Sequence, residues 1–111
     1  MPLFVLLTRI STGAIHQPRS FDTLERHVID RVRAECPEAK WVNNYAVMGP
    51  WDYLDVFDAP DVATAMRVSV LVRTYGHAHT EVWPAMHWSD FRTITRAMPG
   101  KGEAHSLADA P

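Results

Sequence analysis

The sequence predicts a small α+β domain, and three features of its pattern agree on this. Short runs rich in β-branched and large apolar residues alternate with longer runs whose apolar residues recur every three or four positions. Two strand-like runs are separated only by Gly49 to Asp52, which makes them antiparallel neighbours. The chain has 111 residues, so we expect one domain with one core.

The first half of the chain predicts a strand, a helix and a second strand. Leu3 to Ile10 forms the strand, which ends at Ser11-Thr12-Gly13. Pro18-Arg19-Ser20 leads into an amphipathic helix that Pro37 ends. Its apolar stripe is formed by Phe21, Leu24, Val28, Ile29 and Val32, and the side chains predicted to face away are Glu25, Arg26, Asp30, Arg31 and Arg33. Trp41 to Met48 is the second strand.

The second half repeats the order from strand to helix to strand. Tyr53 to Asp58 is the third strand, and Pro60-Asp61 opens a second helix that Gly76 ends as its C′ residue. The face predicted for this helix is formed by Val62, Ala65, Met66, Ser69 and Val70. His77 to Met86 alternates as a fourth strand, and a short helix runs from Ser89 to about Ala97.

The element order β-α-β-β-α-β is the ferredoxin-like arrangement, a four-stranded antiparallel sheet with two helices on one face. Residues 1–97 form this domain, and residues 98–111 are expected to be a flexible C-terminal tail because Pro, Gly, Lys, Glu, Ala and Ser dominate them.

Alternation along the strands predicts which side chains lie on the sheet face away from the helices. In the third strand, Leu54 and Val56 are placed under the helices. The predicted outer face is lined by Trp41, Asn43, Tyr45, Tyr53, Asp55, Phe57, His79 and Glu81. This face is too apolar to stand bare in water and too polar for a plain core. A second copy across a two-fold axis would cover it and enclose a cavity.

Asp55 and His79 are the candidate catalytic residues. A carboxylate flanked by Tyr53 and Phe57 would have its pKa raised by desolvation, as general acids and bases often do. A neighbouring strand could place His79 beside it as an acid–base partner. The alternative is a structural ion pair between Asp55 and Arg9, or an arginine of the other subunit.

Trp51 and Asp52 occupy the tight turn between the second and third strands. Trp51 would be a lid over a flat ligand or a ring in a dimer contact, because aromatic residues are enriched at interfaces. Asp52 would be a carboxylate at the pocket mouth, or it would accept backbone N–H groups of its own turn.

The composition argues against several classes of partner and cofactor. A formal charge of -2 and a pI near 6.3 do not suit nucleic-acid binding. The apolar N-terminal run is too short for a membrane span, so no membrane partner and a cytoplasmic location are expected. His77, His79 and Glu81 are metal-ligand types on one strand face, but strand spacing splays them, so no metal and no cofactor are expected.

Several motifs resemble the GYD family. They are Thr8-Arg9-Ile10 with Gly13, Pro18-Arg19, Gly49-Pro50-Trp51-Asp52, Ala59-Pro60-Asp61, Gly76, Thr80-Glu81, Ala85 and Phe91. The resemblance covers about Leu3 to Phe91 and implies a dimeric α+β-barrel fold and a homodimer or higher homo-oligomer, without an assigned reaction. Trp51 stands where the family usually has tyrosine, which removes a phenol from this turn.

Three functions follow as hypotheses. The first is binding of a small organic ligand in a pocket on the sheet face, walled by the residues of the predicted outer face together with the Trp51-Asp52 turn. The second is a small enzyme of the monooxygenase, isomerase or cyclase type, cofactor-independent or metal-assisted, with Asp55 and His79 as acid–base groups and Asn43 or Tyr45 holding an oxyanion. The third is a structural or stress-associated assembly protein without a ligand.

Overall fold

A computed structural model describes residues 1–14 and 17–100 and confirms the predicted order of elements. The strands are β1 (Leu3–Ile10), β2 (Lys40–Ala46), β3 (Tyr53–Asp58) and β4 (Ala78–Ala85), and the helices are α1 (Arg19–Glu35), α2 (Val62–Gly76) and α3 (Trp88–Ala97), with a short 3-10 turn η1 (Thr12–Ala14). The tail predicted for residues 98–111 falls mostly outside the described residues.

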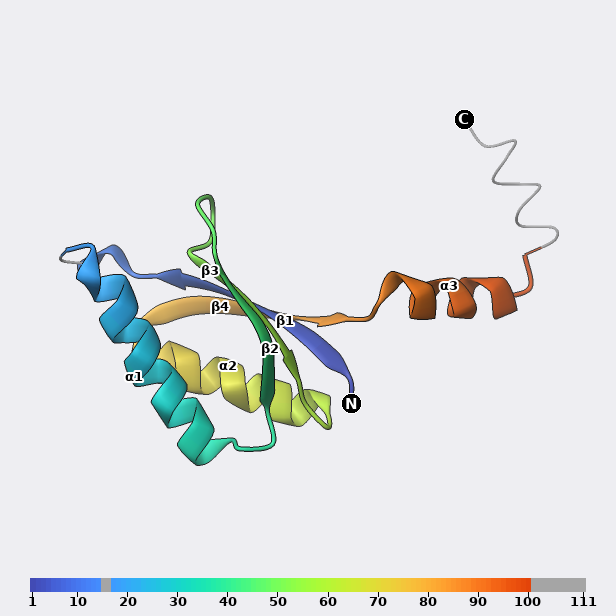
Figure 1. The fold of residues 1–111 in the computed structure, drawn as a ribbon, viewed down its shortest axis with the longest axis horizontal. Helices are drawn as coiled ribbons and strands as arrows, with labels where there is room; N and C mark the ends of the chain where they lie inside the picture. The colour runs from blue at the N-terminus through green and yellow to red at the C-terminus, as the bar shows by residue number, and fades with distance from the viewer. Residues whose placement is uncertain (15–16, 101–111) are drawn as a thin grey trace.

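The strands form one antiparallel sheet in the order β2-β3-β1-β4. Helices α1 and α2 cover the same face of this sheet, and the opposite face is bare (Figure 1). The α+β class, the antiparallel sheet and the two helices on one face are therefore confirmed. We call the helix-covered side the inner face and the bare side the outer face.

The register between β1 and β3 fixes which side chains lie on the inner face. Phe4 pairs with Phe57, and Leu6 pairs with Asp55. Phe4, Leu6 and Phe57 all belong to the buried core, so these pairs point toward the helices. The prediction that Tyr53, Asp55 and Phe57 lie on the outer face is therefore wrong. Both sides of this strand carry apolar residues, so alternation separates the two sets without showing which one is buried.

Strand β2 changes phase through an irregularity. Trp41 pairs with Phe57, but Asn43 pairs with Val56, and the register shifts between them. The extra residue, Val42, is 49% exposed. A bulge of this kind turns the following side chains over relative to strict alternation. Trp41 and Asn44 consequently share the inner face, whereas Asn43 and Tyr45 lie on the outer face.

The core lies between the inner face and the two helices. Its aromatic centre is a stack in which the Phe57 ring lies 5.7 Å from that of Phe4 and 5.1 Å from that of Trp41. Helix α1 contributes Val28 and Val32. Helix α2 contributes Ala65, Val68 and Val72 to the same cluster.

The face predicted for α2 is wrong in part. Ala65 is buried as expected, but Val62, Met66 and Val70 are 59–60% exposed, and Val68 is fully buried. The helix carries apolar residues around more than half of its circumference, so periodicity alone did not identify the buried stripe. The three exposed side chains form a second apolar stripe that faces solvent.

Gly76 and His77 end α2 in a different way from that predicted. Gly76 lies inside the last turn, and the left-handed residue is His77, with φ 49°. A Cβ at position 76 would lie 3.0 Å from Cγ2 of Val28, so glycine permits the close approach of α1. Histidine tolerates the left-handed region better than most side chains. His77 consequently precedes β4 rather than belonging to its face.

Helix α3 leaves the end of β4 and extends away from the rest of the domain (Figure 1). None of its residues is buried. Its apolar side chains are left in solvent, with Trp88 67% exposed and Phe91 44% exposed.

Two valines of α2 test this assignment of faces with the same chemical change. We expect Val68→Ala to lower the free energy of unfolding by about 2 kcal/mol, because it removes two buried methyl groups and leaves a cavity. Val70→Ala should change it by less than about 0.5 kcal/mol, because Val70 faces solvent. Urea denaturation followed by circular dichroism measures both. Equal losses, or a larger loss at position 70, would contradict the observed packing of α2.

Candidate functional site

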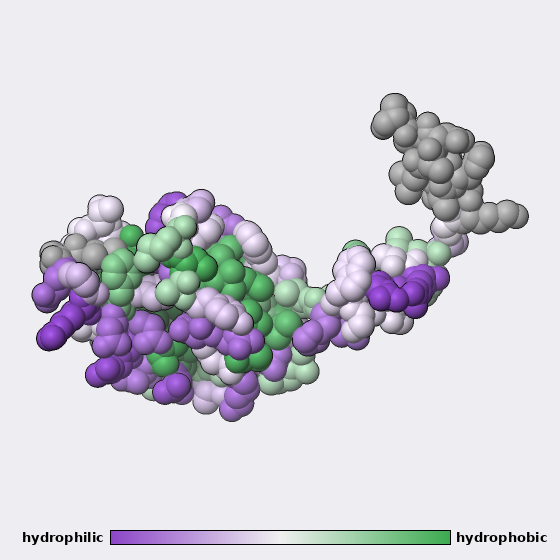
Figure 2. All heavy atoms as spheres, turned by 45° about the horizontal axis from the view of Figure 1, so that its top comes forward, coloured by the Kyte–Doolittle hydropathy of each residue, from purple (hydrophilic) through white to green (hydrophobic). Residues whose placement is uncertain are grey.

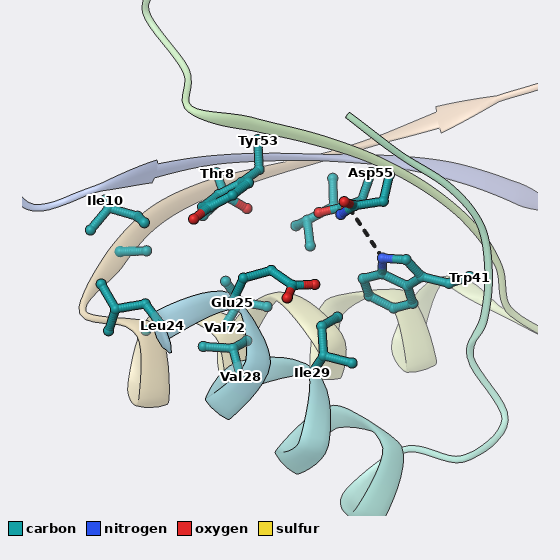
Figure 3. A pocket seen from close by; sticks show the side chains of 14 residues that line it. Thr8, Ile10, Leu24, Glu25, Val28, Ile29, Trp41, Tyr53, Asp55 and Val72 are labelled. Atoms are coloured by element: carbon teal, nitrogen blue, oxygen red, sulfur yellow. Dashed lines mark hydrogen bonds between the residues drawn. The ribbon is translucent and has the colours of Figure 1, made fainter. Parts of the chain in front are cut away.

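A cleft opens between helix α1 and the inner face of the sheet (Figure 3). Its floor comes from β1, β3 and the start of β4, and its opposite wall comes from α1. The lining residues are Leu6, Thr8, Ile10, Leu24, Glu25, Val28, Ile29, Trp41, Asn44, Tyr53, Asp55, Val72, Gly76 and Ala78. The free space is about 30 Å³, which is room for one or two water molecules.

Asp55 is the most deeply buried ionisable side chain lining this cleft, at 6% exposed. The indole Nε1–H of Trp41 donates to its Oδ1 atom at 3.1 Å, and the Asn44 side-chain amide donates to the same oxygen. Burial raises the pKa of Asp55 to about 6, although these two donors oppose the shift. This confirms the expectation that desolvation among aromatic rings perturbs this carboxyl group.

Tyr53 connects the sheet to the first turn of α1. Its hydroxyl donates a hydrogen bond of 2.7 Å to the backbone oxygen of Phe21, and the two rings meet edge to face with centroids 6.3 Å apart. Burial, followed by the negative charge of Glu25, raises the pKa of Tyr53 to about 12. The phenol therefore stays protonated near neutral pH and acts as a hydrogen-bond donor to α1.

Glu25 brings a second carboxylate to the cleft. Figure 3 shows its side chain directed from α1 into the space between Tyr53 and Trp41, on the side of the cleft opposite Asp55. Its negative charge contributes to the raised pKa of Asp55. Among the residues that the structure describes, no lysine, arginine or histidine lines the cleft. The cleft is thus acidic and aromatic.

The prediction that Glu25 faces away from the domain is wrong. It stands beside Leu24 in the sequence and borders the apolar stripe of α1, so a small rotation of the helix brings it to the cleft. Asn44 was not named as a site residue, although alternation placed it opposite Asn43 and Tyr45, on the side where it lies. The residue of β2 that alternation misplaced is Trp41, which the irregularity puts on the inner face. The sequence carries no clear signal for that irregularity.

The predicted site residues divide between the two faces of the sheet. Trp41, Tyr53, Asp55 and Phe57 lie on the inner face, and Phe57 is fully buried beneath Trp41. The residues on the outer face are Asn43, Tyr45, His79 and Glu81. His79 pairs with Arg9, on the side opposite Asp55. The predicted acid–base pair of Asp55 and His79 is therefore wrong.

Trp51 and Asp52 each have a structural partner. The Trp51 ring stacks on His79 with centroids 5.9 Å apart, and the Arg9 guanidinium lies 5.5 Å from the Trp51 centroid. The Oδ2 atom of Asp52 accepts the backbone N–H of Ile10 at 2.8 Å. Asp52 thus accepts a backbone N–H, as one of the two predictions for it stated. The N–H belongs to β1 and not to the turn of Asp52 itself, so the bond joins the turn to β1.

A metal centre has no support among the described residues, where no group of three or more His, Cys, Asp or Glu side chains could hold an ion. His77 lies outside β4, which separates it from His79 and Glu81. Across residues 1–14 and 17–100, every helix is too short or too polar to cross a membrane. Cys36 is a buried free thiol, and burial raises its pKa.

The sheet, the two covering helices and the acidic cleft define a small α+β domain of the ferredoxin-like class. The sequence model of the GYD domain matches residues 4–95, so the chain belongs to the GYD domain family. This confirms the family resemblance found in the sequence. A comparison with curated proteins finds no match. Family membership by itself specifies no ligand or reaction for the cleft.

The raised pKa of Asp55 predicts a pH dependence of stability. Its pKa is about 6 in the folded protein and 3.8 in the unfolded chain, so the folded state binds the proton more tightly. The stabilisation is fully present below the unfolded pKa and is lost as the pH rises through about 6. We expect this residue to lower the free energy of unfolding by on the order of 2–3 kcal/mol between pH 4 and pH 7.

Asp55→Asn isolates this contribution, because the amide oxygen can still accept from Trp41 and Asn44 but does not titrate. Urea denaturation at several pH values should show the variant gaining stability relative to the wild type as the pH increases from 4 to 7. Parallel pH profiles for the two proteins would show that Asp55 titrates normally in the folded state.

Proposed function

We propose that the cleft binds a small, flat organic molecule that carries a protonated or hydrogen-bond-donating nitrogen. The observation that carries the proposal is the state of the Asp55 carboxylate. Both of its hydrogen bonds fall on Oδ1, and Oδ2 has no hydrogen-bond partner among the described residues. A carboxylate that is 6% exposed and only half satisfied offers a strong acceptor to a ligand.

The charge of the cleft selects the same ligand chemistry. Asp55 and Glu25 supply negative charge from opposite walls, and none of the described side chains that line the cleft is a compensating cation. A protonated nitrogen between the two carboxylates would lower the desolvation penalty of Asp55. The rings of Trp41 and Tyr53 add faces on which a flat or cationic group can rest. An anionic ligand would be repelled.

The size of the cleft requires a conformational step. A free space of about 30 Å³ is far below the roughly 300 Å³ of pockets that hold drug-sized ligands. Entry of an aromatic ring therefore requires the first half of α1 to move away from the sheet, as in pockets that open only in a minor conformation. The hydrogen bond from Tyr53 to the Phe21 oxygen is the polar contact that opposes this movement.

Of the groups predicted for catalysis, Asp55 is the one that the cleft contains, and Glu25 is the other carboxylate there. A carboxyl group with a pKa of about 6 can exchange a proton near neutral pH. His79 cannot assist it from the outer face, and Asn43 and Tyr45 also lie on that side. Ligand binding requires only the groups that the cleft brings together, so we place it ahead of catalysis.

A matched pair of ligands tests the proposal. We expect benzylamine to bind at least tenfold more tightly than benzyl alcohol, because a charge-assisted hydrogen bond to a carboxylate contributes about 1.5–3 kcal/mol. Titrations followed by nuclear magnetic resonance would locate binding through the indole N–H signal of Trp41. Asp55→Asn should remove the preference for the amine.

Glu81→Gln is the control, since it removes a carboxylate from the outer face and should leave binding unchanged. Tyr53→Phe should strengthen binding of both compounds by loosening α1. Equal affinities for the amine and the alcohol, or an amine preference that persists in Asp55→Asn, would contradict the proposal.

A second candidate function, self-assembly through the outer face, has its own support. Half-buried Leu3, Val5, Leu54 and Val56 form an apolar strip on this face around Leu7, which is already buried. Tyr45 and Trp83 border the strip and are 51% and 49% exposed. Figure 2, which turns this side partly toward the reader, shows hydrophobic residues gathered across the middle of the domain. A second copy packed sheet to sheet would cover the strip and complete a dimeric α+β barrel.

Val56→Lys tests this assembly by placing a charge in the centre of the strip. We expect it to raise the dimer dissociation constant at least tenfold, because the ammonium group would be buried without a partner. Sedimentation velocity measures the change, and Lys40→Ala, at the edge of the sheet, serves as the control. A wild-type chain that remains monomeric at 100 µM would contradict assembly through this face.

A further inference from the structure

Helix α3 is amphipathic, and its apolar side faces solvent. Trp88, Phe91, Ile94 and Met98 recur at three- or four-residue spacing and are 44–67% exposed. A helix of ten residues with no buried side chain gains no stability from tertiary packing, and isolated helices of this length are marginal in water. The stripe therefore requires a complementary surface.

The same chain carries such a surface between α2 and β4. A groove of about 590 Å³ runs along this edge of the sheet. Its apolar walls are Val62, Met66, Val70, Val82, Trp83 and Pro84. The three α2 residues are the exposed stripe described above, and they span about 12 Å of helix, close to the roughly 15 Å length of α3.

We infer that α3 is an exchanged arm that docks into the α2–β4 groove of a second copy of this chain. Pro84 has no backbone N–H, so the outer edge of β4 is poorly suited to pairing with another strand. Side-chain packing by a helix covers this edge instead. With two-fold symmetry, each copy gives its arm and receives its partner's arm.

The short connection between β4 and α3 indicates that α3 docks in the groove of a second copy and not in the groove of its own chain. Only Met86 and His87 join the two elements. His87 is extended, with φ -63° and ψ 145°, and its carbonyl accepts the N–H groups of Asp90 and Phe91 at the start of α3. The helix therefore continues outward from the end of β4. Reaching its own groove would require a reversal of direction within this link.

Charge and area both fit the exchange. The arm carries Asp90, Arg92 and Arg96. The groove carries Glu81 and Arg73, and Asp58 and Asp61 line the adjoining pocket beyond Val62. The two arginines of the arm therefore have acidic side chains to meet, Glu81 in the groove and Asp58 and Asp61 next to it. An aromatic side chain buries about 150–250 Å² when fully covered, so Trp88 and Phe91 of two arms would bury about 600–1,000 Å². The groove surface that they cover adds a comparable area, and the total is on the order of the 1,200–2,000 Å² that stable interfaces bury.

Cysteine pairs test where the arm docks, independently of any dimer formed through the outer face. The 111-residue chain has one cysteine, Cys36, and it is buried, so background cross-linking is low. Phe91→Cys would be combined with Val62→Cys, Met66→Cys or Val70→Cys in turn and oxidised with oxidised glutathione. We expect at least one pair to give a covalent dimer on a non-reducing gel, because a disulfide forms only when the two Cα atoms approach within about 7 Å.

The control combines Phe91→Cys with Met48→Cys, which is 89% exposed and lies outside the groove; it should stay uncross-linked. Intramolecular disulfides in the groove pairs would show the arm on its own chain and overturn the inference. Absence of any cross-link in all three groove pairs would also overturn it. Neither result bears on ligand binding in the cleft between α1 and the sheet.

Placing opposite charges on the arm and in the groove tests the contact between α3 and the α2–β4 groove by its effect on self-association. Phe91→Glu alone and Met66→Lys alone should each weaken self-association at least tenfold in sedimentation velocity. An equimolar mixture should recover it, because the mixed dimer pairs the introduced glutamate with the introduced lysine and keeps one native arm contact. Both substituted side chains are exposed, so the far-ultraviolet circular dichroism should not change. A mixture that behaves as the two separate variants do would contradict arm exchange.

Discussion

The stack of Phe4, Phe57 and Trp41 is the contact on which the rest of this structure depends. It joins β1, β3 and β2 on one face of the sheet, and it lies under both helices. Because the side chains of a strand alternate, fixing Phe57 inward also fixes Tyr53 and Asp55 inward. The aromatic core therefore determines the chemistry of the cleft. Asp55 lies in the interior because it is on the same face of β3 as Phe57, whose ring belongs to the core.

Burial of Asp55 has an energetic consequence for the domain. Its two donors, Trp41 and Asn44, satisfy one oxygen, while the other faces a cleft with a second carboxylate across it. A domain selected only for stability would replace this group with an apolar one. Sites that keep an incompletely satisfied charge are commonly functional, which is why the cleft is a stronger candidate for ligand binding than the stacked Trp51 and His79 on the outer face.

The sequence predicted the elements of the fold better than it predicted their faces. Local patterns of apolar residues and turn residues identified all four strands and the helices, because these signals are short-range. The inward side of β3 depends on its register with β1, which is a long-range property. The phase of β2 depends on an irregularity after Trp41 that has no distinctive residue. Asp55 was identified by its chemistry, but its neighbours in the cleft were not: helical periodicity placed Glu25 on the solvent side of α1, and strict alternation placed Trp41 on the outer face.

Gly76 allows helices α1 and α2 to approach each other closely beside the cleft. The glycine lets α1 approach α2 until Val28 Cγ2 is 3.0 Å from the place of a side-chain carbon, and both residues line the cleft. A methyl group at this position would crowd Val28 of α1, which would have to shift by a few tenths of an ångström to make room for it. Related chains that differ here would enclose different volumes while keeping the same carboxylates and rings. The absence of a side chain at Gly76 thus fixes how closely α1 and α2 approach beside the cleft.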